Sequence, residues 1–196
     1  MKIAITGHTR GLGKAIYDLY PGAVGFSKST GYNIGNEADA LSIISQSIDC
    51  DVFINNAFHE TAQQYLLERM WAQWRYDNTK TIVNISSRAG YNLDGPGWAG
   101  SKYSTSKANL NEKFREYLLL SSRKCRMISF NPGYIDTDFV ADKPDEPKLT
   151  THQAAEMVAW CINQPGRIEI GELSVWMLGP KWSYIVPLST QEQGMK

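Results

Sequence analysis

Residues 2–13 read KIAITGHTRGLG, a short strand-like run that leads directly into three glycines. The run Lys2–Thr6 is mostly apolar, which predicts a buried strand. Gly7, Gly11 and Gly13 allow a tight turn and a close approach of the backbone, and the amino end of a following helix offers unpaired N–H groups. The stretch therefore predicts a strand, a turn and a helix that together bind a phosphate group. A tight turn without a ligand is the alternative.

Short apolar runs alternate with amphipathic segments along the rest of the chain. The pattern predicts strands at Lys2–Thr6, Ala23–Ser27, Asp51–Asn55, Thr81–Ser86, Arg126–Asn131 and Leu173–Leu178. It predicts helices over Leu12–Tyr20, Glu37–Ile48, Thr61–Tyr76, Ser101–Ser121 and Thr151–Ile162. Strands with few charges that alternate with helices are typical of a parallel sheet covered on both faces, and right-handed crossovers make such a sheet doubly wound. We therefore expect an α/β, Rossmann-like fold with three α-β-α layers, formed as one domain over residues 1–196.

The composition argues against several classes of protein. Twenty basic and twenty acidic side chains cancel, so no electrostatic argument favours nucleic acid or an anionic membrane as a partner. No stretch approaches the roughly 20 apolar residues of a membrane span, and the amino terminus lacks the apolar segment of a secretory signal. Cys50, Cys125 and Cys161 are odd in number and widely spaced, which predicts buried free thiols. We expect a cytoplasmic protein.

The end of the second predicted strand bears on the choice of nucleotide. An Asp or Glu ~20 residues beyond the glycine turn would bind the ribose 2′-hydroxyl of NAD. Residues 25–30 read GFSKST instead, with hydroxyls and a cation but no carboxylate. Arg10, Ser27 and Lys28 together can hold a 2′-phosphate through charge-assisted hydrogen bonds. We predict a preference for NADP(H) over NAD(H), and surface basic residues without a partner are the alternative.

Residues 103–107 read YSTSK, which places a phenol and an ammonium four positions apart on a predicted helix. Side chains at i and i+4 are neighbours on one helical face. A tyrosine with its ordinary pKa near ~10 needs help to exchange protons at neutral pH, and the cation of Lys107 would lower the pKa of Tyr103. Such a pair alone is mostly a solvated helix face. After the glycine turn and the Ser86-Ser87 pair, it indicates oxidoreductase chemistry.

Five motifs follow one another in an order typical of one enzyme family: the glycine turn, NNA at residues 55–57, Ser87, the Tyr103–Lys107 pair, and NPGYIDT at residues 131–137. In these motifs the chain resembles the short-chain dehydrogenases/reductases, over nearly its whole length. The resemblance implies that Tyr103 exchanges a proton with the substrate oxygen, that Ser87 donates a hydrogen bond to it, and that Lys107 also binds the nicotinamide ribose. It implies that hydride chemistry belongs to the cofactor, NADP(H). By position in the motif, Ser87 is the catalytic candidate and Ser86 is structural.

The resemblance also implies which residues line the cofactor. Asn56 and Ala57 belong to this group, Asn33-Ile34 replaces an acidic-aliphatic pair beside the adenine, and the Pro-Gly turn lies near the nicotinamide. The expected cofactor-binding residues are Gly7, Thr9, Arg10, Gly11, Leu12, Gly13, Ser27, Lys28, Asn33, Ile34, Asn56, Ala57, Tyr103, Lys107, Pro132, Gly133, Ile135 and Thr137. No metal-binding residues are expected.

The chain departs from the family pattern in three places. The helix Thr61–Tyr76 lacks, at the expected place, the asparagine that holds a water for proton relay in the family; Gln63 and His59 are candidates to substitute, and we assign the role to neither. Residues 92–97 form the expected insertion. Phe58 stands where the family usually has a glycine.

Residues 133–148 break the alternation of strands and helices. They hold no helical period and follow the carboxyl end of a strand, the edge where open α/β sheets bind ligands. We expect a substrate lid at 133–148, and a surface loop is the alternative. Aromatic residues in loops near the expected site hint at an apolar or aromatic substrate, although packing explains them equally well: Tyr91, Trp98, Tyr134 and Phe139.

The leading hypothesis is an NADPH-dependent oxidoreductase that interconverts a small-molecule carbonyl and an alcohol. A non-catalytic NADP(H)-binding sensor or interaction protein on the same fold is the alternative, favoured by the absent asparagine. A nucleotide-sugar epimerase or dehydratase ranks last, because those relatives usually have a different glycine spacing. Family members commonly associate through helices equivalent to Thr61–Tyr76 and Ser101–Ser121, so we expect a homo-dimer or homo-tetramer.

Overall fold

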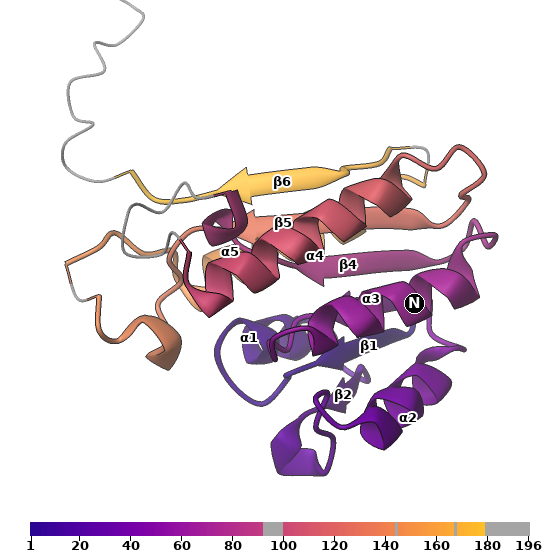
Figure 1. Cartoon of the computed structure of the whole chain (residues 1–196), viewed down its shortest axis with the longest axis horizontal. Helices are drawn as coiled ribbons and strands as arrows, with labels where there is room; N and C mark the ends of the chain where they lie inside the picture. Colours follow the sequence, from indigo (N-terminus) through magenta and orange to yellow (C-terminus); the bar gives the residue numbers. More distant parts are fainter. Residues whose placement is uncertain (92–99, 144, 167, 179–196) are drawn as a thin grey trace, which may run out of the picture.

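The computed structural model describes residues 1–91, 100–143, 145–166 and 168–178. Within these ranges, six strands form one sheet in the order β2-β1-β3-β4-β5-β6, and every neighbouring pair is parallel (Figure 1). The strands are β1 (Ile3–Thr6), β2 (Val24–Phe26), β3 (Val52–Asn55), β4 (Thr81–Ile85), β5 (Arg126–Pro132) and β6 (Glu172–Val175). The parallel sheet expected from the sequence is confirmed.

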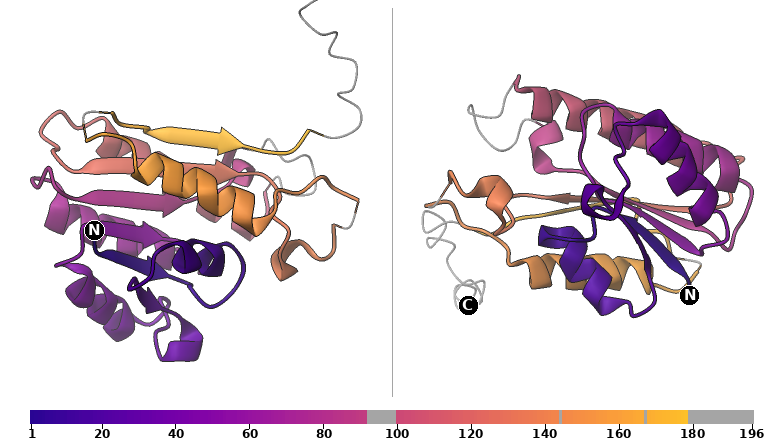
Figure 2. Two further views of the ribbon diagram at one scale, coloured as in Figure 1. Left: turned by 180° about the vertical axis from the view of Figure 1, so that it is seen from behind. Right: turned by 90° about the horizontal axis from the view of Figure 1, so that it is seen from below.

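Helices cover both faces of this sheet. They are α1 (Gly11–Leu19), α2 (Glu37–Ser47), α3 (Ala62–Trp74), α4 (Lys102–Leu118) and α5 (Thr151–Ile162). Helices α1 and α5 lie together on one face, whereas α2, α3 and α4 lie on the other, as the edge-on view in Figure 2 shows. The molecule therefore has the three α-β-α layers of a Rossmann-like fold.

Alternation along the strands divides the apolar core between the two faces. In β1, Ile3 and Ile5 pack with α1 and α5, whereas Ala4 packs with α2, α3 and α4. In β3, Ile54 and Phe53 divide in the same way. Successive side chains of a strand point to opposite faces, so a strand covered on both faces is apolar at every position. This explains why the strands read as continuous apolar runs.

The predicted elements match the observed ones, with ends that differ by a few residues. The strand predicted at Leu173–Leu178 runs instead from Glu172 to Val175, because Val175 pairs with Pro132, the last residue of β5. The helix predicted over Ser101–Ser121 ends at Leu118, where Arg123 donates a hydrogen bond to the Leu118 carbonyl at 2.9 Å. A guanidinium on the final carbonyls is a common way to end a helix.

Residues 133–148, described apart from residue 144, contain more local structure than the sequence predicted. A short 3₁₀ helix, η3 (Asp138–Val140), lies within the segment, and a bridge joins Ile135 to Leu149. Two backbone hydrogen bonds close the base of the segment: Leu149 donates to Tyr134 at 2.9 Å, and Asp136 donates to Leu149 at 2.8 Å. The segment is therefore a loop with a hydrogen-bonded base.

The topology determines where a ligand site can form. The chain leaves β1 toward β2 on one side, and the next strand, β3, lies on the other side of β1. Open α/β sheets bind ligands at such a switch point, outside the carboxyl ends of the strands. The glycine turn follows β1 there, and the Asn-Asn-Ala segment includes and follows the end of β3.

Two further expectations bear on the class of protein. Cys50, Cys125 and Cys161 are buried with free thiols, as predicted. Among the helices of the described residues, none has both the length and the hydrophobicity that crossing a bilayer requires.

The packing of α3 gives a stability prediction. Leu66 of α3 is completely buried, so Leu66→Ala should lower the free energy of unfolding by about 2–5 kcal/mol, because a cavity remains in the core. Leu41 of α2 is 48% exposed, and Leu41→Ala should change the free energy of unfolding by less than about 0.5 kcal/mol. Urea unfolding of both variants measures the difference. Equal losses of unfolding free energy in the two variants would contradict the packing described.

Candidate active site

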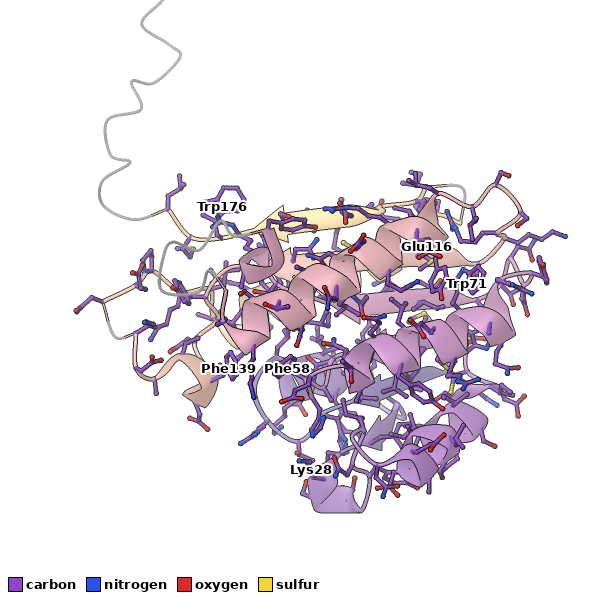
Figure 3. The ribbon with its side chains drawn as sticks, viewed as in Figure 1. Lys28, Phe58, Trp71, Glu116, Phe139 and Trp176 are labelled. Carbon is purple, nitrogen blue, oxygen red and sulfur yellow. The ribbon has the colours of Figure 1, made fainter. Side chains whose placement is uncertain are left out.

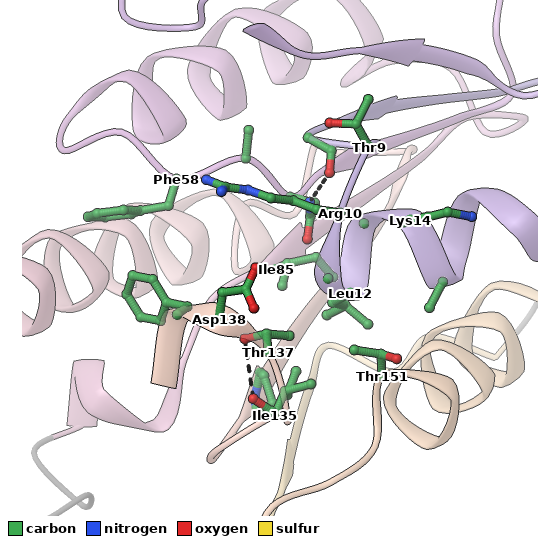
Figure 4. A pocket seen from close by; sticks show the side chains of 18 of the residues that line it. Thr9, Arg10, Leu12, Lys14, Phe58, Ile85, Ile135, Thr137, Asp138 and Thr151 are labelled. Carbon is green, nitrogen blue, oxygen red and sulfur yellow. Dashed lines mark hydrogen bonds between the residues drawn. The ribbon is translucent and has the colours of Figure 1, made fainter. Parts of the chain in front are cut away.

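A cavity of about 1180 Å³ lies at the carboxyl ends of the central strands (Figure 4). Every predicted catalytic or cofactor-binding residue lines it, with the exception of Asn33. The Asn33 side chain instead accepts a hydrogen bond from the Gly35 N–H at 3.2 Å, and its own N–H donates to Asp39 at 2.9 Å. Asn33 therefore belongs to the turn that leads into α2, whereas the adjacent Ile34 lines the cavity.

The glycine turn has a conformation that other residues cannot adopt without strain. Gly7 and Gly11 have φ angles of +74° and +55°, in the left-handed region. A Cβ on Gly13 would lie 2.1 Å from the Gly7 carbonyl oxygen and 2.5 Å from Nδ2 of Asn56. The Asn56 amide donates to the carbonyls of Thr6 at 2.9 Å and Gly7 at 3.3 Å. The end of β3 thus holds the turn against the first turn of α1.

The amino end of α1 provides donors for an anion. Arg10 is the N-cap residue, and within the described residues no side chain caps the helix. The first N–H groups of a helix have no partner inside it, and they carry the positive end of the helix dipole. Gly11, Leu12 and Gly13, which begin the helix, line the cavity. The cradle fits a pyrophosphate.

A cluster of hydroxyl groups lies beside the glycine turn, after β2. Ser27 Oγ lies 2.9 Å from Ser29 Oγ, and the Ser29 hydroxyl donates to Thr9 Oγ1 at 3.2 Å. Arg10 and Lys28 line the same cavity, and neither side chain forms a hydrogen bond or ion pair within the part of the chain described. Two unpaired cations and several hydroxyls fit a phosphate group. Ser29 was missed from the sequence, although it belongs to the hydroxyl-rich run that indicated this site.

Ser87, Tyr103 and Lys107 line the same cavity as the glycine turn. Ser87 follows β4, and its Oγ accepts a hydrogen bond from the Ala89 N–H at 3.1 Å. Tyr103 and Lys107 lie in the first half of α4, and the Lys107 Nζ is 5.7 Å from the centroid of the Tyr103 ring. The Ser86 hydroxyl binds Asn111 Oδ1 at 2.5 Å and so ties β4 to α4. The two adjacent serines therefore have different partners.

The ammonium of Lys107 lies in a closed environment. The residue is only 3% exposed, and Nζ donates to Gln63 Oε1 at 2.8 Å and to the Ile85 carbonyl at 2.9 Å. Burial lowers the pKa of Lys107 to about 7. Desolvation disfavours the charged form, and in the described part of the chain no carboxylate pairs with the ammonium to offset this.

Two aromatic rings flank Tyr103. The ring centroids of Phe58 and Tyr103 are 4.9 Å apart, and those of Tyr103 and Phe139 are 5.1 Å apart. Phe58 and Phe139 are 39% and 57% exposed, and they lie near each other in Figure 3. The ring of Phe58 also lies 5.3 Å from Lys107 Nζ. Phe58 therefore lies over the buried ammonium and supplies an apolar wall.

Other residues singled out from the sequence lie in different places. Tyr134 lines the cavity, whereas the Tyr91 hydroxyl donates to Glu172 of β6 at 3.2 Å and is not among the lining residues. The ring of His59 lines the cavity and packs against Gly35, where a Cβ would meet it at 2.6 Å. Residues 92–97 and Trp98 lie outside the described residues.

No family model and no curated protein matches the sequence. Solved structures, in contrast, match almost the whole chain. A closed form of serine dehydrogenase complexed with NADP+ is 17% identical, with a TM-score of 0.71, and the match covers 100% of this chain and 98% of that one. A short-chain dehydrogenase/reductase from Vibrio parahaemolyticus is 15% identical, with a TM-score of 0.71 and coverages of 90% and 100%. A short-chain dehydrogenase from Burkholderia cenocepacia in complex with NADP is 19% identical, with a TM-score of 0.66 and coverages of 91% and 88%. The chain therefore has the fold of the short-chain dehydrogenases/reductases.

Proposed function

We propose that this chain is an NADP(H)-dependent oxidoreductase of the short-chain dehydrogenase/reductase type, which interconverts a small-molecule carbonyl and an alcohol. One observation carries the proposal: Ser87, Tyr103 and Lys107 line the same cavity as the glycine turn. The likeness in fold to dehydrogenases complexed with NADP supports it.

The lining residues divide by the part of the cofactor that each would hold. The amino end of α1 suits the pyrophosphate, and Ser27, Lys28 and Arg10 suit the 2′-phosphate. Ile34 would lie beside the adenine, and Gly133 beside the nicotinamide. When bound, a nicotinamide cofactor supplies or accepts the hydride.

The remaining chemistry is proton transfer and charge stabilisation by this chain's own side chains. Tyr103 would exchange a proton at its phenolic oxygen with the substrate oxygen. Ser87 Oγ already accepts from the Ala89 N–H, and its O–H has no partner among the described residues, so it can donate to that substrate oxygen as negative charge develops. The nearby Lys107 ammonium would stabilise the phenolate form of Tyr103.

The walls of the cavity suggest what surrounds the substrate. Phe58 and Phe139 present exposed aromatic rings that both contact Tyr103, which favours an apolar or aromatic group next to the reacting carbonyl. Phe139 belongs to residues 133–148, which we propose as the substrate lid.

Tyr103→Phe tests the proposed proton transfer. We expect the rate of NADPH oxidation with a panel of carbonyl compounds to fall by about 10²- to 10⁴-fold, because the phenolic proton is lost, while NADPH still binds. Tyr91→Phe is the matched control, since Tyr91 contacts Glu172 of β6 instead of the cavity. NADPH absorbance measures turnover, and NADPH fluorescence measures binding.

A second candidate function is a non-catalytic NADP(H) sensor, and a specific contact favours it. Phe58 packs against Tyr103 and covers Lys107, which restricts access to both groups. If wild type and Tyr103→Phe bind NADPH equally and neither oxidises it with any carbonyl in the panel, the sensor replaces the enzyme as the better assignment.

The two unpaired cations give a prediction for cofactor choice. Arg10→Ala and Lys28→Ala should each weaken NADPH binding by about 10- to 100-fold, because each removes a charge-assisted bond to the 2′-phosphate. NADH binding should stay unchanged, and so should NADPH binding by Arg69→Ala on the exposed side of α3. Titration of both cofactors measures these affinities. A wild type that binds NADH as tightly as NADPH contradicts the assignment.

We also propose a homo-dimer or homo-tetramer that uses the outer side of α3 and α4. There the ring of Trp71 stacks on Tyr117 at 4.1 Å, and the Arg75 guanidinium lies 4.9 Å from the Trp71 ring. Aromatic and arginine side chains are enriched in protein interfaces. Size-exclusion chromatography with light scattering should give a dimer or tetramer, and a monomer at micromolar concentration would refute it.

A further inference from the structure

The side chain of Gln63 is buried between the ends of two strands and the ammonium of Lys107. Gln63 lies in the first turn of α3 and is 1% exposed. Its Nε2 donates to the Asn55 carbonyl and to the Ile85 carbonyl, both at 2.8 Å, and its Oε1 accepts from Lys107 Nζ at 2.8 Å. Every polar atom of the amide is therefore satisfied.

The contacts determine which way the amide points. Oxygen and nitrogen of a glutamine amide can exchange places, so the surrounding donors and acceptors decide the orientation. Two carbonyl oxygens, from Asn55 and Ile85, require the NH₂ group on their side. The Gln63 oxygen must then face Lys107.

The side chain of Asn55 binds the backbone of Gln63. The Asn55 amide donates to the Gln63 carbonyl at 2.8 Å and to Asn84 Oδ1 at 3.1 Å. Gln63 and Asn55 are thus joined reciprocally, each side chain to the backbone of the other. The hydrogen bonds from Asn84 through Asn55 and Gln63 to Lys107 connect β4 and β3 through α3 to α4. Within the described residues, the Gln63 amide has all its partners, whereas Asn55 Oδ1 and Asn84 Nδ2 have none.

The contact also determines how Lys107 can act. An ammonium has three N–H donors, and Gln63 and Ile85 accept two of them. The third remains for a group in the cavity that Lys107 lines. A neutral acceptor holds the ammonium in place without the full stabilisation that a carboxylate would give.

The groups that face the Lys107 ammonium come from several elements. Tyr103 of the same helix is the titratable group beside it, at 5.7 Å from ring centroid to Nζ. Helix α3 presents Gln63, β4 presents the Ile85 carbonyl, and the connection after β3 presents the Phe58 ring. Within the described residues, no acidic side chain contributes to the shift of the Lys107 pKa.

We propose that Gln63 is the positioning residue for Lys107: its side-chain oxygen fixes the ammonium beside Tyr103, and its NH₂ group ties that contact to the ends of β3 and β4. The role rests on the proposed function, because it matters for catalysis only when Lys107 assists Tyr103. Gln63 acts through Lys107 and does not itself touch the substrate.

Gln63→Met removes the acceptor at nearly constant volume. The buried ammonium then loses one of two partners, so the pKa of Lys107 should fall by about one to two pH units from its value of about 7. Carbonyl reduction needs the protonated Lys107, so its rate falls as pH rises through that pKa. The decline should therefore move to lower pH in Gln63→Met. Gln64→Met is the matched control, because Gln64 binds Glu68 on the outside of α3.

A second readout does not depend on turnover. Protein labelled with ¹³C-lysine, with the Lys107 signal assigned through Lys107→Met, reports the Lys107 pKa directly. If wild type reduces no carbonyl, the proposed function fails, yet this titration still decides whether Gln63 holds the ammonium. The inference is overturned if Lys107 titrates at the same pH in wild type, Gln63→Met and Gln64→Met.

Gln63→Glu is a second test of the same proposal, and it can be used if Gln63→Met does not fold. A carboxylate beside the ammonium favours its charged form and should raise the pKa of Lys107, so the decline in rate should move to higher pH. A general disturbance of α3 would not give shifts of opposite sign in the two variants. An unchanged titration in Gln63→Glu overturns the proposal as well.

Discussion

The parallel pairing of β1 with β3 is the interaction on which the arrangement of the site depends. Ile5 pairs with Ile54, and this register brings the Asn56 amide onto the carbonyls of Thr6 and Gly7. Thr6 Oγ1 in turn accepts the N–H groups of Asn56 and Ala57 at 3.0 and 2.9 Å. Side-chain and backbone hydrogen bonds thus join the two strand ends at the switch point. A shift of register would separate the glycine turn from the rest of the cavity.

The site uses burial in two opposite ways. At the proposed nucleotide site, the exposed side chains of Arg10 and Lys28 line a cavity that a cluster of hydroxyls also lines. At the proposed catalytic site, Lys107 is enclosed, and the cost of burying its charge lowers its pKa to about 7. A buried charge is tolerated only when its donors find partners, and the side-chain oxygen of Gln63 and the backbone carbonyl of Ile85 provide them. Accessible cations suit the binding of an anion, whereas an enclosed ammonium suits the tuning of a neighbouring phenol.

The residues expected from the sequence to act in catalysis or bind the cofactor line one cavity, because their motifs lie at strand ends and parallel strands bring those ends together. Asn33 is the one expected cofactor-binding residue that does not line the cavity, since Asp39 and Gly35 hold it in the turn before α2. Ser29 was overlooked, although the same hydroxyl-rich run contains it. Gln63 was considered without being assigned, because nothing local indicates that a glutamine early in a helix points inward.

The order of strands and helices, the glycine turn and the Tyr103–Lys107 spacing were determined by the sequence alone, because apolar periodicity and turn chemistry are local properties. The surroundings of Lys107 were decided only by the tertiary structure. Gln63 lies 44 positions before Lys107, and their contact depends on how α3 and α4 pack over the same face of the sheet. Burial and its effect on a charge are properties of packing, so no local pattern contains them.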